Sequence, residues 1–234
     1  MNNDINYETF IFLSNKKFKI SVIETNNSKI VYEEKKFIDN NNNCLEFEKF
    51  KNFLDDNILK IEKRIRDFVK DVYLIIETEA FISTQVSIKN NNNGNLLTSS
   101  NLSYSINEAK DHCFKSLTQE KIIHIIINKY NIDNKDYQNL PINIKCNIFI
   151  LDLTFICLPK AFIKDLENIM KKYQISISQT LSSRYIESVF DGNDQDLFKK
   201  VRQLIEGFNE NEVILNKKIN KKQGFFEKFF NFFS

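Results

Sequence analysis

The sequence predicts a mixed α/β fold, and three stretches near its start carry this prediction. Residues 8–24 and 29–38 show the residue types of three successive strands, with a tight connection at Ser14–Lys16. Residues 45–70 place apolar side chains at spacings of three and four, which is typical of an amphipathic helix. The run VYLIIE (72–77) then favours a buried strand, so the first 77 residues are expected to form β-β-β-α-β.

The rest of the chain continues to alternate between the two kinds of element. Ser105 followed by Glu108 suggests the N-cap of a helix over 105–117. Pro159 stands where another helix could begin. We expect strands at 80–89, 121–130, 142–153 and 175–178, helices after Pro159, at 181–190 and at 197–208, and a polar linker at 209–220.

Composition excludes several classes of protein. With 42% hydrophobic and 27% charged residues, the 234-residue chain can bury a core and is not intrinsically disordered. The net charge of +2 gives no sign of a nucleic-acid partner. The four cysteines form no C-x-x-C pair, which argues against a zinc or redox site and favours a reducing cytosol. The polar N-terminus does not resemble a signal peptide, and no apolar run is long enough to span a bilayer.

The last eighteen residues, KKINKKQGFFEKFFNFFS, have the pattern of a helix that lies in a membrane interface. On a helix that starts near Gly224, five phenylalanines share one face, while Glu227, Lys228 and Asn231 lie on the other. Lysines that anionic lipids attract precede this helix. The alternative is a terminal helix docked on its own domain. The predicted membrane-binding residues are Lys217, Lys218, Lys221, Lys222, Phe225, Phe226, Lys228, Phe229, Phe230 and Phe233.

The sequence shows no catalytic constellation. His112 and Cys113 are neighbours on a predicted helix and therefore point in different directions, whereas His124 lies in an apolar strand and is expected to be structural. Asp55 and Asp56 are expected to be solvated. Neither a phosphate-binding motif nor a dinucleotide fingerprint is present, and four glycines leave little material for one. We therefore expect no enzymatic activity, no cofactor and no metal.

The order of elements, taken with certain residues, resembles FtsA, the actin-like bacterial division protein that tethers the Z-ring to the membrane. The stretch FIFLSNKKFKISVIE (10–24) looks like the first strand-turn-strand of that family, and KIIHIIINKYNID (121–133) looks like a later strand segment. In the latter, His124, Tyr130 and Asp133 match, and Ile127 takes the place of a proline. Residues 143–190 resemble the elements that close the first half, and GFFEKFFNFF (224–233) is similar to the membrane-targeting helix.

Two departures from the family pattern bear on nucleotide binding. The resemblance implies an acidic residue and a glycine beside the ATP phosphates, but here Phe12 and Ser14 hold those positions, followed by Asn15. Phenylalanine cannot hold a magnesium-bound water, and loss of the glycine crowds the loop. In addition, Phe190 is followed almost directly by the last helices, so the family's second half, with its adenosine site and FtsZ-peptide groove, has no counterpart.

The resemblance therefore implies half of an actin-like fold. Its 1A-like subdomain, with a ribonuclease H-like sheet, would comprise 1–79 and 164–208, and an inserted SHS2-type 1C subdomain 80–163. A linker (209–220) and the amphipathic helix (221–234) would follow.

The implied function is that of a division protein which tethers the divisome to the inner face of the cytoplasmic membrane at the septum, without ATP. The implied partners are anionic lipids, late division proteins and a second copy through 1C, and FtsZ only through a different surface. The alternatives are an actin-like platform of a pilus or secretion system and a remnant ATP-binding protein.

Overall fold

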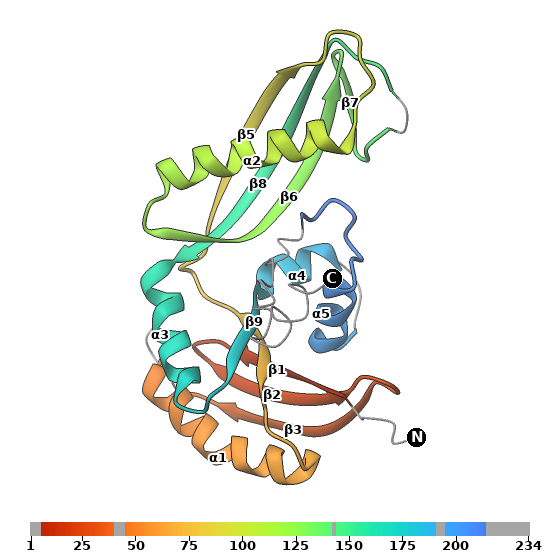
Figure 1. The fold of residues 1–234 in the computed structure, drawn as a ribbon. Helices are drawn as coiled ribbons and strands as arrows, with labels where there is room; N and C mark the ends of the chain where they lie inside the picture. Colours follow the sequence, from red (N-terminus) through yellow and green to blue (C-terminus); the bar gives the residue numbers. More distant parts are fainter. Residues whose placement is uncertain (1–5, 40–44, 142–143, 191–194, 214–234) are drawn as a thin grey trace, which may run out of the picture.

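The computed structural model describes residues 6–39, 45–141, 144–190 and 195–213, and in this part of the chain the strands form two separate sheets (Figure 1). The first sheet has the order β3-β2-β1-β4-β9, and the second has the order β5-β8-β6-β7. The predicted mixed α/β class is confirmed. The strands are β1 (Tyr7–Leu13), β2 (Lys17–Glu24), β3 (Lys29–Phe37), β4 (Asp71–Ile76), β5 (Ile82–Asn91), β6 (Glu120–Ile132), β7 (Lys135–Tyr137), β8 (Ile148–Pro159) and β9 (Ser176–Ser182).

Helices cover both faces of the first sheet, so its central strands are apolar on both sides. In the whole described part of the chain, the helices are α1 (Phe47–Ile65), α2 (Ser99–Ser116), α3 (Lys160–Lys171), α4 (Ser183–Val189) and α5 (Leu197–Ile205), and all of these except α2 pack on the first sheet. In β1, Ile11 and Leu13 enter the core under α1 and α3, whereas Phe10 and Phe12 enter the core under α4 and α5. A strand buried on both faces needs a nearly continuous apolar run, which is what β1 and β4 supply.

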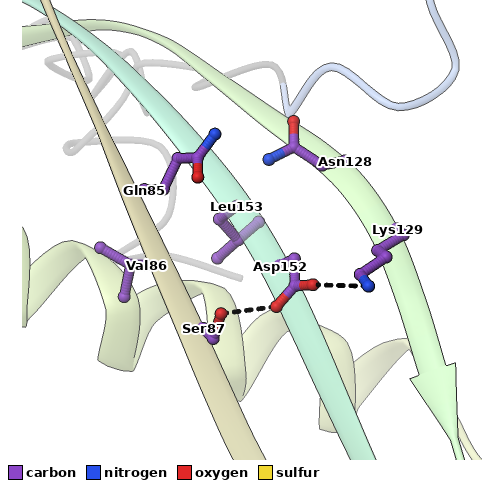
Figure 2. A pocket seen from close by; sticks show the side chains of 7 residues that line it. All are labelled: Gln85, Val86, Ser87, Asn128, Lys129, Asp152 and Leu153. Carbon is purple, nitrogen blue, oxygen red and sulfur yellow. Dashed lines mark hydrogen bonds and ion pairs between the residues drawn. The ribbon is translucent and has the colours of Figure 1, made fainter.

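The second sheet is antiparallel and is covered by α2 on one face only (Figure 1). Phe149, Leu151 and Leu153 of β8 pack toward α2 in a core of their own. Around Asp152 the opposite face is polar and shallowly hollowed, with a pocket of about 310 Å³ (Figure 2). There Ser87 donates a hydrogen bond to Asp152 over 2.5 Å, and the Lys129 ammonium lies 3.5 Å from the same carboxylate. Nearer the first sheet, Ile126 and Ile156 of this face pack against the core under α4 and α5. Buried and partly exposed residues therefore alternate along β8, because α2 covers only one face of its sheet.

The boundaries of several predicted helices needed correction. Helix α1 ends at Ile65, where Arg66 takes a left-handed conformation, so Phe68 lies beyond the helix and is 74% exposed instead of joining the apolar stripe. Helix α2 begins at Ser99 with Thr98 as its N-cap, because Thr98 and Asn101 form a reciprocal capping box. The predicted cap, Ser105, is instead buried in mid-helix.

The strand predictions were correct in place but not in length. β8 starts at Ile148 and runs to Pro159, later at both ends than predicted, and β9 continues to Ser182 through residues predicted as the start of a helix. The short strand β7 was not predicted. Helix α3 begins directly at Lys160, so it contains residue 163, where the inserted subdomain was predicted to end.

Candidate functional site

The turn between β1 and β2, where the resemblance places a phosphate loop, is closed by its own side chain. Ser14 donates its backbone N–H to the Lys17 carbonyl over 3.0 Å. Its hydroxyl accepts the N–H groups of Lys16 and Lys17 at 3.2 and 2.9 Å and donates to the Lys17 carbonyl at 3.1 Å. Asn15 sits half-buried at the tip. The N–H groups of Ser14, Lys16 and Lys17, which could have faced a phosphate at this turn, are therefore already bonded within the protein.

Phe12, at the position of the family's acidic residue, belongs to the core. Its side chain is 3% exposed and lies in the cluster under α4 and α5 with Phe198 and Leu181. The Lys17 ammonium lies 4.9 Å from the centre of its ring, a cation–π contact. A carboxylate in this place would be buried among apolar groups, at a large cost in free energy.

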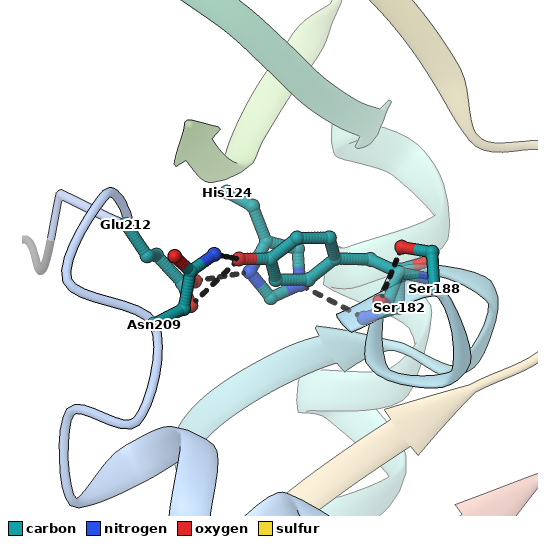
Figure 3. Close-up of polar contacts among 6 residues, drawn as sticks. His124, Ser182, Ser188, Asn209 and Glu212 are labelled. Atoms are coloured by element: carbon teal, nitrogen blue, oxygen red, sulfur yellow. Dashed lines mark hydrogen bonds and ion pairs between the residues drawn. The ribbon is translucent and has the colours of Figure 1, made fainter. Parts of the chain in front are cut away.

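A second polar feature joins the two sheets at the place where the described chain ends. It consists of His124 on β6, Ser182 at the end of β9, Tyr185 on α4, and Asn209 and Glu212 after α5; we call these five residues the clasp (Figure 3). The side chain of His124 has no solvent exposure, and that of Glu212 has only 9%. This burial agrees with the expectation that His124 has a structural role.

The hydrogen bonds of the clasp define the tautomer of His124. The Ser182 backbone N–H donates to Nε2 over 3.0 Å, so Nε2 must carry a lone pair. The proton is then on Nδ1, which donates to the Glu212 carboxylate over 2.7 Å. Because Nε2 is both buried and occupied, this His–Glu pair has no free nitrogen with which to activate a nucleophile. The geometry is that of a structural bond and not of a catalytic dyad.

Tyr185 completes the arrangement. Its ring centre lies 4.4 Å from that of His124, and its hydroxyl donates to the second Glu212 oxygen over 3.0 Å while accepting from Asn209 over 2.9 Å. Burial, and after it the Glu212 carboxylate, raises the pKa of the Tyr185 phenol, which keeps the phenol a donor over the whole physiological range.

The backbone of the same segment is also bonded to β6. We call residues 209–213 the strap. The Ile127 N–H donates to the Asn211 carbonyl over 2.8 Å, and the Val213 N–H donates to the Ile125 carbonyl over 2.9 Å. Residues 209–213 were predicted to belong to a polar linker, but Glu212 forms an isolated antiparallel bridge with Ile126 of β6, flanked by these two hydrogen bonds. The polar sequence gave no local signal of this contact; only a histidine inside an apolar strand, which requires a partner, indicated it.

The ten predicted membrane-binding residues, from Lys217 to Phe233, lie outside the described residues. Where the chain is described, no helix is long and apolar enough to cross a membrane. The described ranges also contain no cluster of three or more metal-ligating side chains. His112 is exposed on α2 whereas its neighbour Cys113 is buried, so the two do not form a pair.

In comparisons with known proteins, the chain is similar to several solved structures. No protein-family model and no curated protein sequence matches the chain. The cytoplasmic domain of EpsL, an inner-membrane component of the type II secretion system of Vibrio cholerae, is 9% identical with a TM-score of 0.40, over 77% of this chain and 59% of that one. The PilM–PilN complex of type IV pilus biogenesis is 5% identical with a TM-score of 0.48, over 78% and 49%.

A third match is a Bacteroides thetaiotaomicron protein with an actin-like ATPase fold and unknown function. It is 15% identical with a TM-score of 0.35, over 78% of this chain and 55% of that one. The chain thus spans roughly half to three-fifths of the solved structures that it matches. At these TM-scores the likeness carries no functional argument, and the FtsA-like assignment stays a prediction from the sequence.

Proposed function

We propose that this chain is a membrane-tethered scaffold, an FtsA-like division protein that works without ATP. The observation that carries the proposal is the closed β1–β2 turn. The Ser14 hydroxyl accepts the N–H groups of Lys16 and Lys17, and Phe12 fills the position of the acidic residue with a buried ring. A protein whose phosphate loop is replaced by core packing is suited to tethering that does not depend on a nucleotide, and not to a nucleotide-driven switch.

The tail would supply the membrane contact. A fully buried phenylalanine contributes ~1.5–3 kcal/mol, and a side chain in the interface about half of that. Ordering the helix opposes this gain, so attachment is peripheral and reversible and is strengthened when several copies bind together. The strap would fix the start of the tail to the folded part, because the Val213 N–H is bonded to the Ile125 carbonyl of β6.

Vesicle sedimentation tests the tether. The double variant Phe226→Asp/Phe229→Asp places two charges on the apolar face and is expected to reduce binding to phosphatidylglycerol vesicles by at least about tenfold. Asn231→Asp adds one such charge on the opposite face and is the control, with little effect expected. Equal loss in both variants, or pelleting of the double variant like the wild type, would refute the anchor.

Thermal melting with Mg-ATP tests the absence of nucleotide binding. The proposal predicts an unchanged melting temperature, since a ligand that binds only the folded state must raise it. A clear increase would overturn the inference from Phe12 and Ser14 and favour the remnant ATP-binding protein.

A fluorescent fusion separates the remaining alternatives. Bands at midcell that disappear when 217–234 is deleted are the expected result. Polar foci would instead favour a platform of a pilus or secretion system.

A further inference from the structure

The strands at the edges of the two sheets differ in how they are protected against pairing with another chain. In β3, five of nine residues are charged (Lys29, Glu33, Glu34, Lys35 and Lys36), and its register with β2 shifts at Val22/Ile23. Charged side chains and irregular register are the usual means by which proteins protect an exposed edge. The first edge of the first sheet is therefore guarded.

The other edge of that sheet, β9, is guarded in a different way. Its register with β4 shifts between Val72 and Tyr73, which interrupts the edge. At its end, the Ser182 N–H is already bonded to His124. On the second sheet, β7 has only three residues, and the neighbouring part of β6 is covered by the strap.

Strand β5 has none of these protections. It pairs with β8 through ten consecutive residues without a register shift, and Lys89 is its only charged residue. In the described part of the chain, its residues form no backbone hydrogen bond outside the ladder with β8. β5 is thus a long, regular edge with exposed backbone donors and acceptors, of the kind that accepts a further strand.

We propose that β5 pairs antiparallel with β5 of a second copy of this chain, about a twofold axis at Val86. β5 lies in the predicted inserted subdomain (80–163), where the family resemblance also implies contact with a second copy, but the inference rests on the geometry of the strand and not on membrane tethering. It commits to a second copy because the strand is complementary to itself in this register. On the α2 side, where Val86 and Ile88 pack, Val86 faces Val86 of the second copy and Thr84 faces its Ile88. Such β-branched pairs are favourable across an antiparallel ladder.

The polar face is complementary in the same register. Gln85 faces Ser87 of the second copy, so the row of Ser87, Asp152 and Lys129 would continue from one copy into the other (Figure 2). Lys89 faces Ser83 of the second copy, and no like charges meet. A one-residue slip would place apolar residues against the polar face and is disfavoured.

Ser83 is exposed and provides a test whose sign depends on the register. In the full chain, Ser83→Lys would place an ammonium opposite Lys89 of the second copy, twice per dimer by symmetry, whereas Ser83→Glu would place a carboxylate there. We expect the first change to raise the dissociation constant of the dimer roughly 2- to 30-fold and the second to lower it by a similar factor, measured by sedimentation equilibrium. Glu34→Lys, on the guarded edge β3, is the control and should leave the equilibrium unchanged.

A cross-link provides a second, independent measurement. In a Cys44→Ser background, Val86→Cys is expected to form an intermolecular disulfide under mild oxidation, because residues directly opposite in an antiparallel pair have suitable separations. Glu34→Cys should not form one. A wild-type chain that stays monomeric both in solution and on vesicles, or Ser83 variants that change the constant in the same direction, would overturn the proposal.

Discussion

Removal of the Glu212 carboxylate tests whether the clasp holds the strap. Glu212→Ala removes the acceptor of two buried hydrogen bonds, from His124 Nδ1 at 2.7 Å and from the Tyr185 hydroxyl at 3.0 Å. Hydrogen bonds to charged groups contribute about 1.5–3 kcal/mol each, which gives roughly 3–6 kcal/mol for the pair. The strap can detach and let water reach the two donors, and this relaxation limits the loss to about 3 kcal/mol.

Hydrogen exchange at one amide reports this loss directly. The Ile127 N–H is bonded to Asn211 of the strap, so its protection depends on strap attachment. A loss of about 3 kcal/mol predicts that its protection factor falls roughly 100-fold in Glu212→Ala. Urea unfolding of the same variant should show a decrease in the free energy of unfolding of comparable size or smaller.

Two further variants serve as controls for Glu212→Ala. Glu210→Ala changes an exposed neighbour in the strap and should alter the free energy of unfolding by less than about 0.5 kcal/mol. Glu212→Gln keeps an acceptor for His124 and should lose less than Glu212→Ala. If Glu212→Ala behaves like Glu210→Ala, with the Ile127 amide still protected, the clasp does not hold the strap.

Three further predictions concern the core, a helix cap and alkaline pH. Phe12→Ala should lower the free energy of unfolding by about 3–5 kcal/mol in urea titrations, because it leaves a cavity under α5; a loss near zero would mean that the ring is not packed there. Thr98→Ala removes the N-cap of α2 and should cost about 1 kcal/mol by thermal melting, whereas the exposed Ser100→Ala should cost less. The pKa of Tyr185 is raised from 10.0, so the folded state keeps this proton longer than the unfolded state, and its contribution to stability is present below about pH 10 and is lost as pH rises further. Tyr185→Phe should therefore reduce the fall in urea midpoint between about pH 8 and pH 11, and an unchanged fall would assign it to other groups.

Local pattern was sufficient to predict most elements of the first sheet. The alternation of β2 and the stripe of α1 follow from side-chain period alone, and Ser14–Lys16 was correctly placed as a turn. Predictions failed where a tertiary contact competed with a local signal. Ser105 resembles an N-cap, but its hydroxyl bonds to the Asn101 carbonyl and accepts from Asn90 of β5.

The sequence by itself determined the mixed α/β class, the apolar strands of the first sheet and the character of the tail, because each depends on the period or density of apolar side chains within one segment. Only the tertiary structure decided that Phe12 is a core residue, that the strap is bonded to β6, and that β5 is an unprotected edge. These features join residues far apart in the chain, such as His124 and Glu212, or depend on which strand has no neighbour. A hydrogen bond between distant residues leaves no periodic trace in either segment, so it becomes visible only once the fold has brought its donor and acceptor together.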